Sequence, residues 1–232
     1  MLKVDLHLHT SEDPADIIVH DAHQLIDRAV ALGFQALAVT LHDKDLSDAR
    51  LFAYARERGL TLLPGVERTI EKRHVLLINF PQGTDHVRTF TDLAKLRSRT
   101  NGLVIAPHPF FPDRTCLRSD LEPNAELFDA VEWSYFWTRG LNFNAPAARW
   151  AEQHGKPLVA NSDLHDLRQL GRTYSMIDAD PDADAICAAI KAGRLSIHTS
   201  SVPKLELAQV LGGMLRRGNK RQAAVDQALA AT

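Results

Sequence analysis

Short apolar stretches rich in valine, isoleucine and leucine alternate along the chain with longer stretches whose apolar residues recur at helical spacing. The short stretches predict strands at residues 2–9, 34–41, 61–63, 75–80, 103–106, 130–133 and 158–160. The longer ones predict helices at residues 21–33, 47–58, 85–97, 144–154 and 182–192, and Gly33 and Gly59 suit the ends of the first two. Because strands and helices alternate, we expect an α/β fold with a mainly parallel sheet, either open or closed into a barrel.

The length and composition of the chain favour one main folding unit. With 232 residues, 45% of them hydrophobic, the chain can bury a substantial core, and no repeat or linker divides it. We expect the main unit to cover residues 1–203 and a helical extension to cover residues 204–232, with a basic break at residues 216–220.

Charge, cysteine content and hydropathy favour none of the classes of nucleic-acid-binding, membrane or disulfide-rich secreted proteins. The formal net charge of −2 gives no general electrostatic reason to expect nucleic-acid or membrane binding. Cys116 and Cys187 lie far apart in a pattern without metal-ligand spacing, so we expect reduced thiols. No signal-peptide pattern precedes the first histidine motif, and no apolar run is long enough to span a bilayer. We therefore expect a cytoplasmic protein.

Histidines and carboxylates recur where the predicted strands begin or end. The set consists of His7, His9, Asp13, His42, Glu67, His74, His108, Asp163 and His165. Imidazoles and carboxylates gathered from several strand ends into one pocket are what a multinuclear site for divalent metals requires. The pattern therefore predicts a metal-dependent hydrolase.

Two pairs in this set carry the strongest signal. Side chains alternate along a strand, so Asp5, His7 and His9 are expected on one face, with Asp5 able to orient one imidazole from behind. The segment from Asp163 to His165 repeats this spacing at the end of another strand. One such pair is often an ordinary surface feature, whereas two on one chain favour a metal site.

Several members of the set also have plainer interpretations. A solvated loop carboxylate explains Glu67 about as well as a ligand does. His108 lies between two prolines that favour an extended conformation, and a buried turn histidine is the alternative there. In the early acidic loop Asp13 is the first choice and Asp16 the reserve, with helix capping as the competing role of Asp16.

Six motifs occur together in a fixed order. They are Asp5-Leu6-His7-Leu8-His9-Thr10, Thr40-Leu41-His42-Asp43, Gly65-Val66-Glu67, His74, Pro107-His108-Pro109 and Ser162-Asp163-Leu164-His165. With these motifs, the sequence from residue 3 to about residue 178 resembles the PHP (polymerase and histidinol phosphatase) superfamily. The resemblance implies a single-domain, distorted (β/α)7 TIM-like barrel with a trinuclear metal site at the C-terminal strand ends.

The resemblance also implies how the ions would be held. One ion would be bound by His7, His9, Glu67 and Asp163, a second by Glu67, His74 and His108, and a third by Asp13, His42 and His165. Glu67, Asp163 and His165 would carry the catalytic roles. The chain departs from the family pattern at Leu41, where an aspartate is usual, and around Asp13, where the acidic loop is shifted by one residue.

The activity implied by the resemblance is hydrolysis of a phosphate ester in a small metabolite or nucleotide by a metal-activated hydroxide. Mixed histidine and carboxylate ligation suits zinc, manganese or iron, and three divalent ions are expected. Arg68, Arg139 and Arg172 are candidates to bind the phosphate, although surface charge is the plainer interpretation of each. The aromatic run at residues 133–137 is explained equally well by a pocket wall or by core packing.

Other functions remain open. A nuclease or oligonucleotide 3′-end hydrolase would need a basic groove, which the overall charge does not favour. A non-catalytic PHP module would bind metal for stability or partner contact, and a metallohydrolase acting on a different bond is also compatible with a barrel. The small-molecule phosphoesterase is the first choice because no nucleic-acid module accompanies the predicted barrel.

Overall fold

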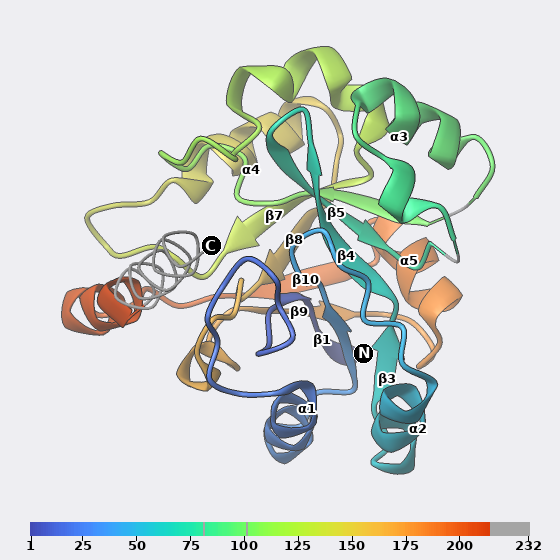
Figure 1. Ribbon diagram of the computed structural model, residues 1–232. Coiled ribbons are helices and arrows are strands. Elements are labelled where there is room, and N and C mark those ends of the chain that lie inside the picture. Colours follow the sequence, from blue (N-terminus) through green and yellow to red (C-terminus); the bar gives the residue numbers. More distant parts are fainter. Residues whose placement is uncertain (81, 101, 214–232) are drawn as a thin grey trace, which may run out of the picture.

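The computed structural model describes residues 1–80, 82–100 and 102–213 (Figure 1). Its strands are β1 (Leu2–Leu8), β2 (Ala36–Val39), β3 (Thr61–Leu63), β4 (Gly65–Ile70), β5 (Arg73–Ile78), β6 (Leu103–Ala106), β7 (Ala130–Ser134), β8 (Leu158–Asn161), β9 (Tyr174–Ile177) and β10 (Leu195–His198). Its α-helices are α1 (Ala22–Ala31), α2 (Ala49–Glu57), α3 (Phe90–Arg97), α4 (Asn144–Gln153) and α5 (Ala183–Lys191), and residues 204–213 are also helical.

The described strands form two mixed sheets rather than one parallel sheet. Each sheet has five strands, in the orders β10-β9-β1-β2-β3 and β4-β5-β6-β7-β8. β1 is parallel to β2 but antiparallel to β9, and β5 is antiparallel to both β4 and β6. The chain is α/β, but its described residues form no closed barrel, so the prediction of a (β/α)7 barrel is wrong.

The connections explain this difference. Pro64 alone separates β3 from β4, which leaves no room for the helix that a parallel crossover needs. β4 and β5 are joined by Glu71 and Lys72, both with positive φ, as a tight hairpin turn requires. Neither residue is the asparagine or glycine that usually marks such a turn, so this hairpin had no clear sequence signal. β9 and β10 were also missed.

Helices cover the outer faces of the two sheets. α1 and α2 pack on the first sheet and α3 and α4 on the second, in two separate apolar clusters (Figure 1). A third apolar cluster combines residues of both sheets with α5. The five helices predicted between residues 21 and 192 are all present, with ends that differ by up to five residues. The predicted extension over residues 204–232 is helical at 204–213, and its remainder lies outside the described residues.

The two sheets approach each other at isolated bridges. Leu8 at the end of β1 pairs with Leu164, just beyond β8, and His42, just beyond β2, pairs with Glu67 in β4. These bridges bring the histidine and carboxylate motifs of both sheets to the same end of the molecule. In the described part of the chain, no helix is both long and apolar enough to cross a membrane.

Candidate metal centre

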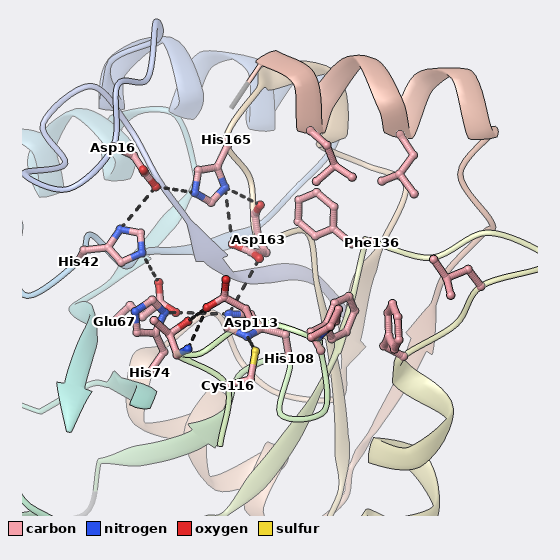
Figure 2. Close-up of a pocket in the computed structure, with 17 residues that line it drawn as sticks. Asp16, His42, Glu67, His74, His108, Asp113, Cys116, Phe136, Asp163 and His165 are labelled. Atoms are coloured by element: carbon pink, nitrogen blue, oxygen red, sulfur yellow. Dashed lines mark hydrogen bonds and ion pairs between the residues drawn. The ribbon is translucent and has the colours of Figure 1, made fainter. Parts of the chain in front are cut away.

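Glu67 lies at the centre of a cluster of histidines (Figure 2). Its carboxylate is 99% buried and is surrounded by five ring nitrogens. The distances to the nearer Glu67 oxygen are 3.3 Å for His7 Nε2, 3.3 Å for His9 Nε2, 3.2 Å for His42 Nε2, 2.7 Å for His74 Nδ1 and 3.4 Å for His108 Nε2. Glu67 is therefore no solvated loop residue, and it lies inside β4 rather than after a strand.

Asp163 approaches the same cluster from the loop after β8. Its Oδ1 atom lies 3.4 Å from His7 Nε2 and 3.6 Å from His9 Nε2. The same oxygen is 3.6 Å from His165 Nδ1, so Asp163 connects His165 to the group around Glu67. Asp163 has a φ of 48°, an uncommon conformation for a residue with a side chain and one that recurs at functional sites.

The regular pairing of β1 with β2 is interrupted around His7. The register between β1 and β2 shifts between Asp5 and Leu8. Leu6 packs in the cluster between the sheets, whereas Leu8 packs in the cluster under α1, so the alternation of side chains is interrupted between them. His7 lies within this interrupted stretch and His9 follows it, and both approach Glu67.

Asp5 does not orient an imidazole as its spacing suggested. Its carboxylate accepts hydrogen bonds from the backbone N–H groups of His7 and Ser162 instead. Burial raises the pKa of Asp5 to about 7, against the opposing effect of the hydrogen bonds from Ser162. Asp5 thus holds the end of β1 beside the loop that carries Asp163.

Glu132 in β7 has the role that the sequence had assigned to Asp5. Its Oε1 atom lies 2.9 Å from His7 Nδ1, and its Oε2 atom accepts a hydrogen bond from the backbone N–H of His108. Asn161 donates a further hydrogen bond to Oε1. Such a carboxylate fixes the orientation and basicity of a ligating histidine. An acidic residue inside an apolar strand was the available signal, because it must be paired there.

The two candidate aspartates of the early loop occupy different places. Asp13 Oδ2 lies 3.0 Å from Nδ1 of both His9 and His42, on the side of each ring away from Glu67. Asp16 lines the pocket, and its Oδ2 lies 3.0 Å from His165 Nε2. Asp16 does not cap a helix, since Asp21 caps α1. Asp13 therefore backs two imidazoles, while Asp16 faces the open side of the cluster.

The loop after β6 positions His108. We expected an extended backbone there, but the φ of His108 is 29°, in the left-handed region. Its Nδ1 lies 3.3 Å from the Sγ of Cys116, a buried free thiol that the sequence did not connect with the site. The conformation departs from the extended one that Pro109 favours, and the hydrogen bond from the backbone N–H of His108 to Glu132 helps to hold it.

The buried atoms of the cluster fit a group of cations. His7 Nε2, His9 Nε2 and Glu67 Oε1 are buried and form no hydrogen bond, although they lie within 3.5 Å of partners in the cluster. These atoms converge without satisfying one another, which is costly for buried polar groups. A divalent ion between them would satisfy them, and nitrogen and carboxylate oxygen donors are those that such ions accept.

The pKa values in the cluster are set by burial and by the opposite charges of neighbouring side chains. Burial disfavours the charged form of His7, but Glu132, Asp163 and Glu67 outweigh it and raise its pKa to about 10. The pKa values of His9 and His108 are also raised, despite burial. Burial alone would raise the pKa of Glu67, yet the surrounding histidines hold it well below its usual value. The lowered pKa of Glu67 and the raised pKa values of His7, His9 and His108 both favour an ionised carboxylate among protonated imidazoles.

Above the cluster lies a pocket of about 440 Å³. One side carries Asp16, His42, Glu67, His74, His108, Asp163 and His165. The other side is apolar and is formed by Phe111, Phe136, Leu141, Phe143, Leu207 and Leu211. Of the aromatic run at residues 133–137, only Phe136 lines this pocket, and the other lining rings were not predicted.

The three candidate arginines lie away from this pocket. Arg68 is buried and donates from Nη1 to the backbone oxygen and carboxylate of Asp43. Arg139 lines a separate surface recess, and Arg172 pairs with Glu206. Among the described residues, the pocket is lined by no lysine or arginine.

Comparisons with known proteins bear on the family resemblance and on the fold. A family model described as PHP-associated matches residues 142–195. No curated protein sequence matches the chain.

Several solved structures share the fold. One is a two-domain protein containing a predicted PHP-like metal-dependent phosphoesterase from Bacteroides vulgatus, with a TM-score of 0.66, 19% identity and coverage of 92% of this chain and 69% of that one. Another is PsfC from Pseudomonas syringae, with a TM-score of 0.65, 18% identity and coverage of 94% and 98%. A third is the lesion-specific endonuclease PfuEndoQ from Pyrococcus furiosus, with a TM-score of 0.59, 18% identity and coverage of 84% and 57%. The family-model match over residues 142–195 supports the resemblance to the PHP superfamily, and the solved structures show a shared fold.

Proposed function

We propose that this protein is a metal-dependent phosphoesterase that hydrolyses a small phosphorylated metabolite or nucleotide at a trinuclear site. The observation that carries the proposal is the convergence of five imidazoles on the buried carboxylate of Glu67 at the base of a pocket. Divalent ions bound there would lower the pKa of water and neutralise charge on the phosphoryl oxygens.

The proposed ligands follow the grouping that the superfamily implies, with one change. His7, His9, Glu67 and Asp163 would hold the first ion, and Glu67, His74 and His108 the second. His42, His165 and Asp16 would hold the third. We assign Asp16 rather than Asp13 to the third ion because Asp16 lines the pocket. Asp13 instead holds His9 and His42 from behind. Substituting Asn for Asp16 should then remove one equivalent of metal, whereas Asp13→Asn should lower affinity without changing the stoichiometry.

Three of the proposed metal ligands are also the candidates for catalysis. Like four of the other proposed ligands, Glu67, Asp163 and His165 line the cavity, and we assign the catalytic roles to these three, as the resemblance to the superfamily implies. The pKa of Asp163 is held below its usual value because histidines outweigh its burial, so its carboxylate stays ionised when a substrate arrives. The mixed donor set suits zinc, manganese or iron.

The charge of the pocket favours a small substrate over a nucleic acid. A nuclease binds the phosphate backbone of its substrate through lysine and arginine side chains, and these contacts supply much of its affinity. The described residues that line the pocket include neither. The likeness to PfuEndoQ, which is named as an endonuclease, therefore supports the fold rather than that substrate class.

Elemental analysis of the purified protein, combined with a panel of phosphomonoesters, phosphodiesters and short oligonucleotides, tests the proposal. We expect three equivalents of divalent metal per chain and hydrolysis of a phosphomonoester that chelators abolish. Asp163→Ala should lose both metal and activity, while Asp85→Ala, at an exposed position away from the pocket, should keep both. A metal-replete, fully active Asp163→Ala variant would contradict the assignment, and selective cleavage of oligonucleotides would favour the nuclease.

A further inference from the structure

The pocket has two chemically different sides. The metal-ligand side is charged, and the opposite side contains six apolar residues from three segments: the loop after β6, the connection from β7 to α4, and the helix at residues 204–213. Figure 2 shows Phe136 among the side chains of the apolar side, with the helix running along it. We call this side the apolar wall, and it consists of Phe111, Phe136, Leu141, Phe143, Leu207 and Leu211.

The apolar wall begins directly beside a proposed metal ligand. The ring of Phe111 lies 6.2 Å from that of His108, between centroids, in an edge-on arrangement. Phe143 continues the wall, with its ring centroid 5.4 Å from that of Phe111. A phosphoryl group bound at the ions would thus carry its organic substituent towards this wall.

The helix at residues 204–213 is fastened in place by polar contacts. Glu206 accepts a hydrogen bond of 3.0 Å from the hydroxyl of the buried Tyr135 and pairs with Arg172 at 2.9 Å. Just before the helix, the backbone N–H of Val202 bonds to the carbonyl of Trp137. These contacts hold one face of the helix on the protein.

The same helix presents two leucines to the pocket. Leu207 and Leu211 are four residues apart, so they lie on one face of the helix, and both line the cavity. Leu205 lies on the same helix but is 73% exposed and does not line the cavity. An open face of leucine and phenylalanine beside a catalytic site is costly in water unless a ligand covers it.

Resting on the phosphoesterase function proposed above, we infer that the substrate carries an apolar alkyl or aryl group on its phosphate ester. The helix at residues 204–213 then acts as the element that selects for this group. A second phosphate would find no lysine or arginine among the described lining residues. The pocket volume of about 440 Å³ suits a small organic group rather than a polymer.

Ethyl phosphate and hexyl phosphate provide the test, because their leaving alcohols have nearly the same pKa and differ in apolar surface. With the metal-replete full chain we expect kcat/KM for hexyl phosphate to exceed that for ethyl phosphate by at least about tenfold, as extra methylene groups in an apolar pocket allow. Leu207→Gln combined with Leu211→Gln should bring the two values within about threefold of each other, mainly by lowering the value for the hexyl ester. The control Leu205→Gln should keep the wild-type ratio.

The ratio is measured within each variant, so a partly folded preparation does not distort it. Equal rates for both esters in the wild-type protein would overturn the inference while leaving the phosphoesterase function intact. If neither ester is hydrolysed, the panel of phosphate esters described above still decides the proposed function. In that case, calorimetry with hexylphosphonate and ethylphosphonate decides the inference, and equal affinities overturn it. A change in oligomeric state of the double variant with an unchanged ester ratio would also overturn it, because the wall would then be a contact between copies.

Discussion

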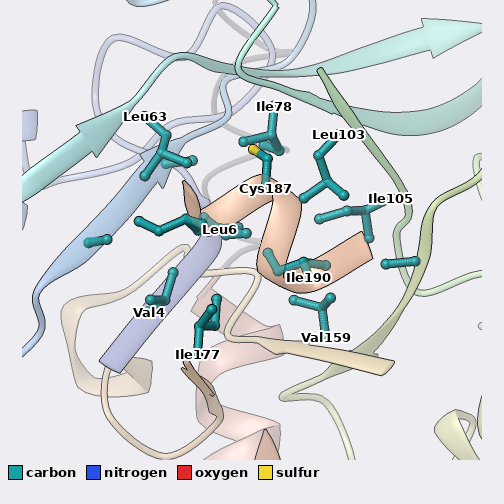
Figure 3. Close-up of a cluster of buried hydrophobic side chains, with 14 of the residues drawn as sticks. Val4, Leu6, Leu63, Ile78, Leu103, Ile105, Val159, Ile177, Cys187 and Ile190 are labelled. Atoms are coloured by element: carbon teal, nitrogen blue, oxygen red, sulfur yellow. The ribbon is translucent and has the colours of Figure 1, made fainter. Parts of the chain in front are cut away.

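Strand β1 enters two buried regions of opposite character. Val4 and Leu6 join the apolar cluster between the sheets, where they pack with residues such as Val159 and Ile190 of α5 (Figure 3). Only one residue beyond Leu6, His7 enters the charged cluster around Glu67. All of these side chains are fully or almost fully buried. The interruption in the pairing of β1 with β2 marks the boundary between the two regions.

The comparison shows that burial serves different ends in the two regions. In the apolar cluster every contact stabilises the fold without directional demands. In the charged cluster burial makes each unpaired nitrogen and oxygen costly, and the atoms converge without forming hydrogen bonds to one another. We conclude that the first region stabilises the protein, whereas the second is arranged for ions and is stabilised by them.

The largest expected effect concerns Glu67→Gln. This change removes the carboxylate that faces five imidazoles, so the variant should lose at least one metal ion per chain. The loss of several kcal/mol of charge stabilisation corresponds to a fall in kcat/KM of roughly 1,000-fold or more. Elemental analysis and steady-state kinetics measure both effects. Glu126→Gln, at an exposed site, is the control. A Glu67→Gln variant that keeps all its metal ions would contradict the conclusion that the charged region is arranged for ions.

The complementary change in the apolar cluster is Ile190→Ala. Removing this fully buried side chain should lower the free energy of unfolding by about 2–5 kcal/mol. The metal content per folded molecule should remain that of the wild-type protein, because the site lies in the other region. Chemical denaturation and elemental analysis measure the two quantities. The control Ile17→Ala, at a partly exposed position, should lower the free energy of unfolding by less than about 1 kcal/mol. Loss of metal from folded Ile190→Ala would show that the two regions are not independent.

The sequence carried more information about the site than about the sheets. Strand ends and histidine spacing were enough to single out His7, His9, Glu67, His108 and Asp163, which the structure places side by side, although metal binding by them stays a prediction. The resemblance to the PHP superfamily, expected from the motif order, is supported by the family-model match over residues 142–195. Such motifs can be recognised because each is local and contiguous.

The missed features depend on contacts between distant segments. The pairing of β4 with β5 is set by a turn whose residues, Glu71 and Lys72, lack the usual hairpin signature. The role of Glu132 depends on a hydrogen bond to His7, 125 residues away, which no local pattern reveals. Arg172 looked available for phosphate because its partner, Glu206, lies in a segment whose placement was unpredictable.

A smaller effect is expected for Glu132→Gln, which acts on the charged region through His7. The amide keeps the size of the side chain but loses the charge that orients the His7 ring. Metal affinity should fall by about 10–100-fold, as for other residues that support a ligand. Competition with a metal-binding dye measures this affinity, and Glu152→Gln, at an exposed position, provides the control. Because Glu132 is a positioning residue, activity should return at high metal concentration, and activity that stays lost there would argue against this role.

The smallest expected effect is on the way thermal stability depends on pH, compared between the metal-free and the metal-loaded protein. In the metal-free protein, neighbouring carboxylates overcome burial and raise the pKa of His7 to about 10 and that of His9 as well. Burial is also outweighed at His108, where Cys116, Glu67 and Asp163 raise the pKa. A histidine with a raised pKa contributes its full stabilisation below its unfolded value of about 6.5 and loses it as the pH rises through the folded value. The Tm of metal-free protein should therefore fall by several degrees between about pH 6.5 and pH 10.

Metal should remove this dependence, because bound ions replace the protons that balance Glu67 and Asp163. The Tm of metal-loaded protein should change less over the same range, and metal affinity should rise with pH as fewer protons compete for the imidazoles. Thermal unfolding of both forms, followed in matched buffers, measures the difference. Since the apolar cluster around α5 contains no group that titrates near neutral pH, equal slopes in the two forms would mean that the charged region is not where ions bind.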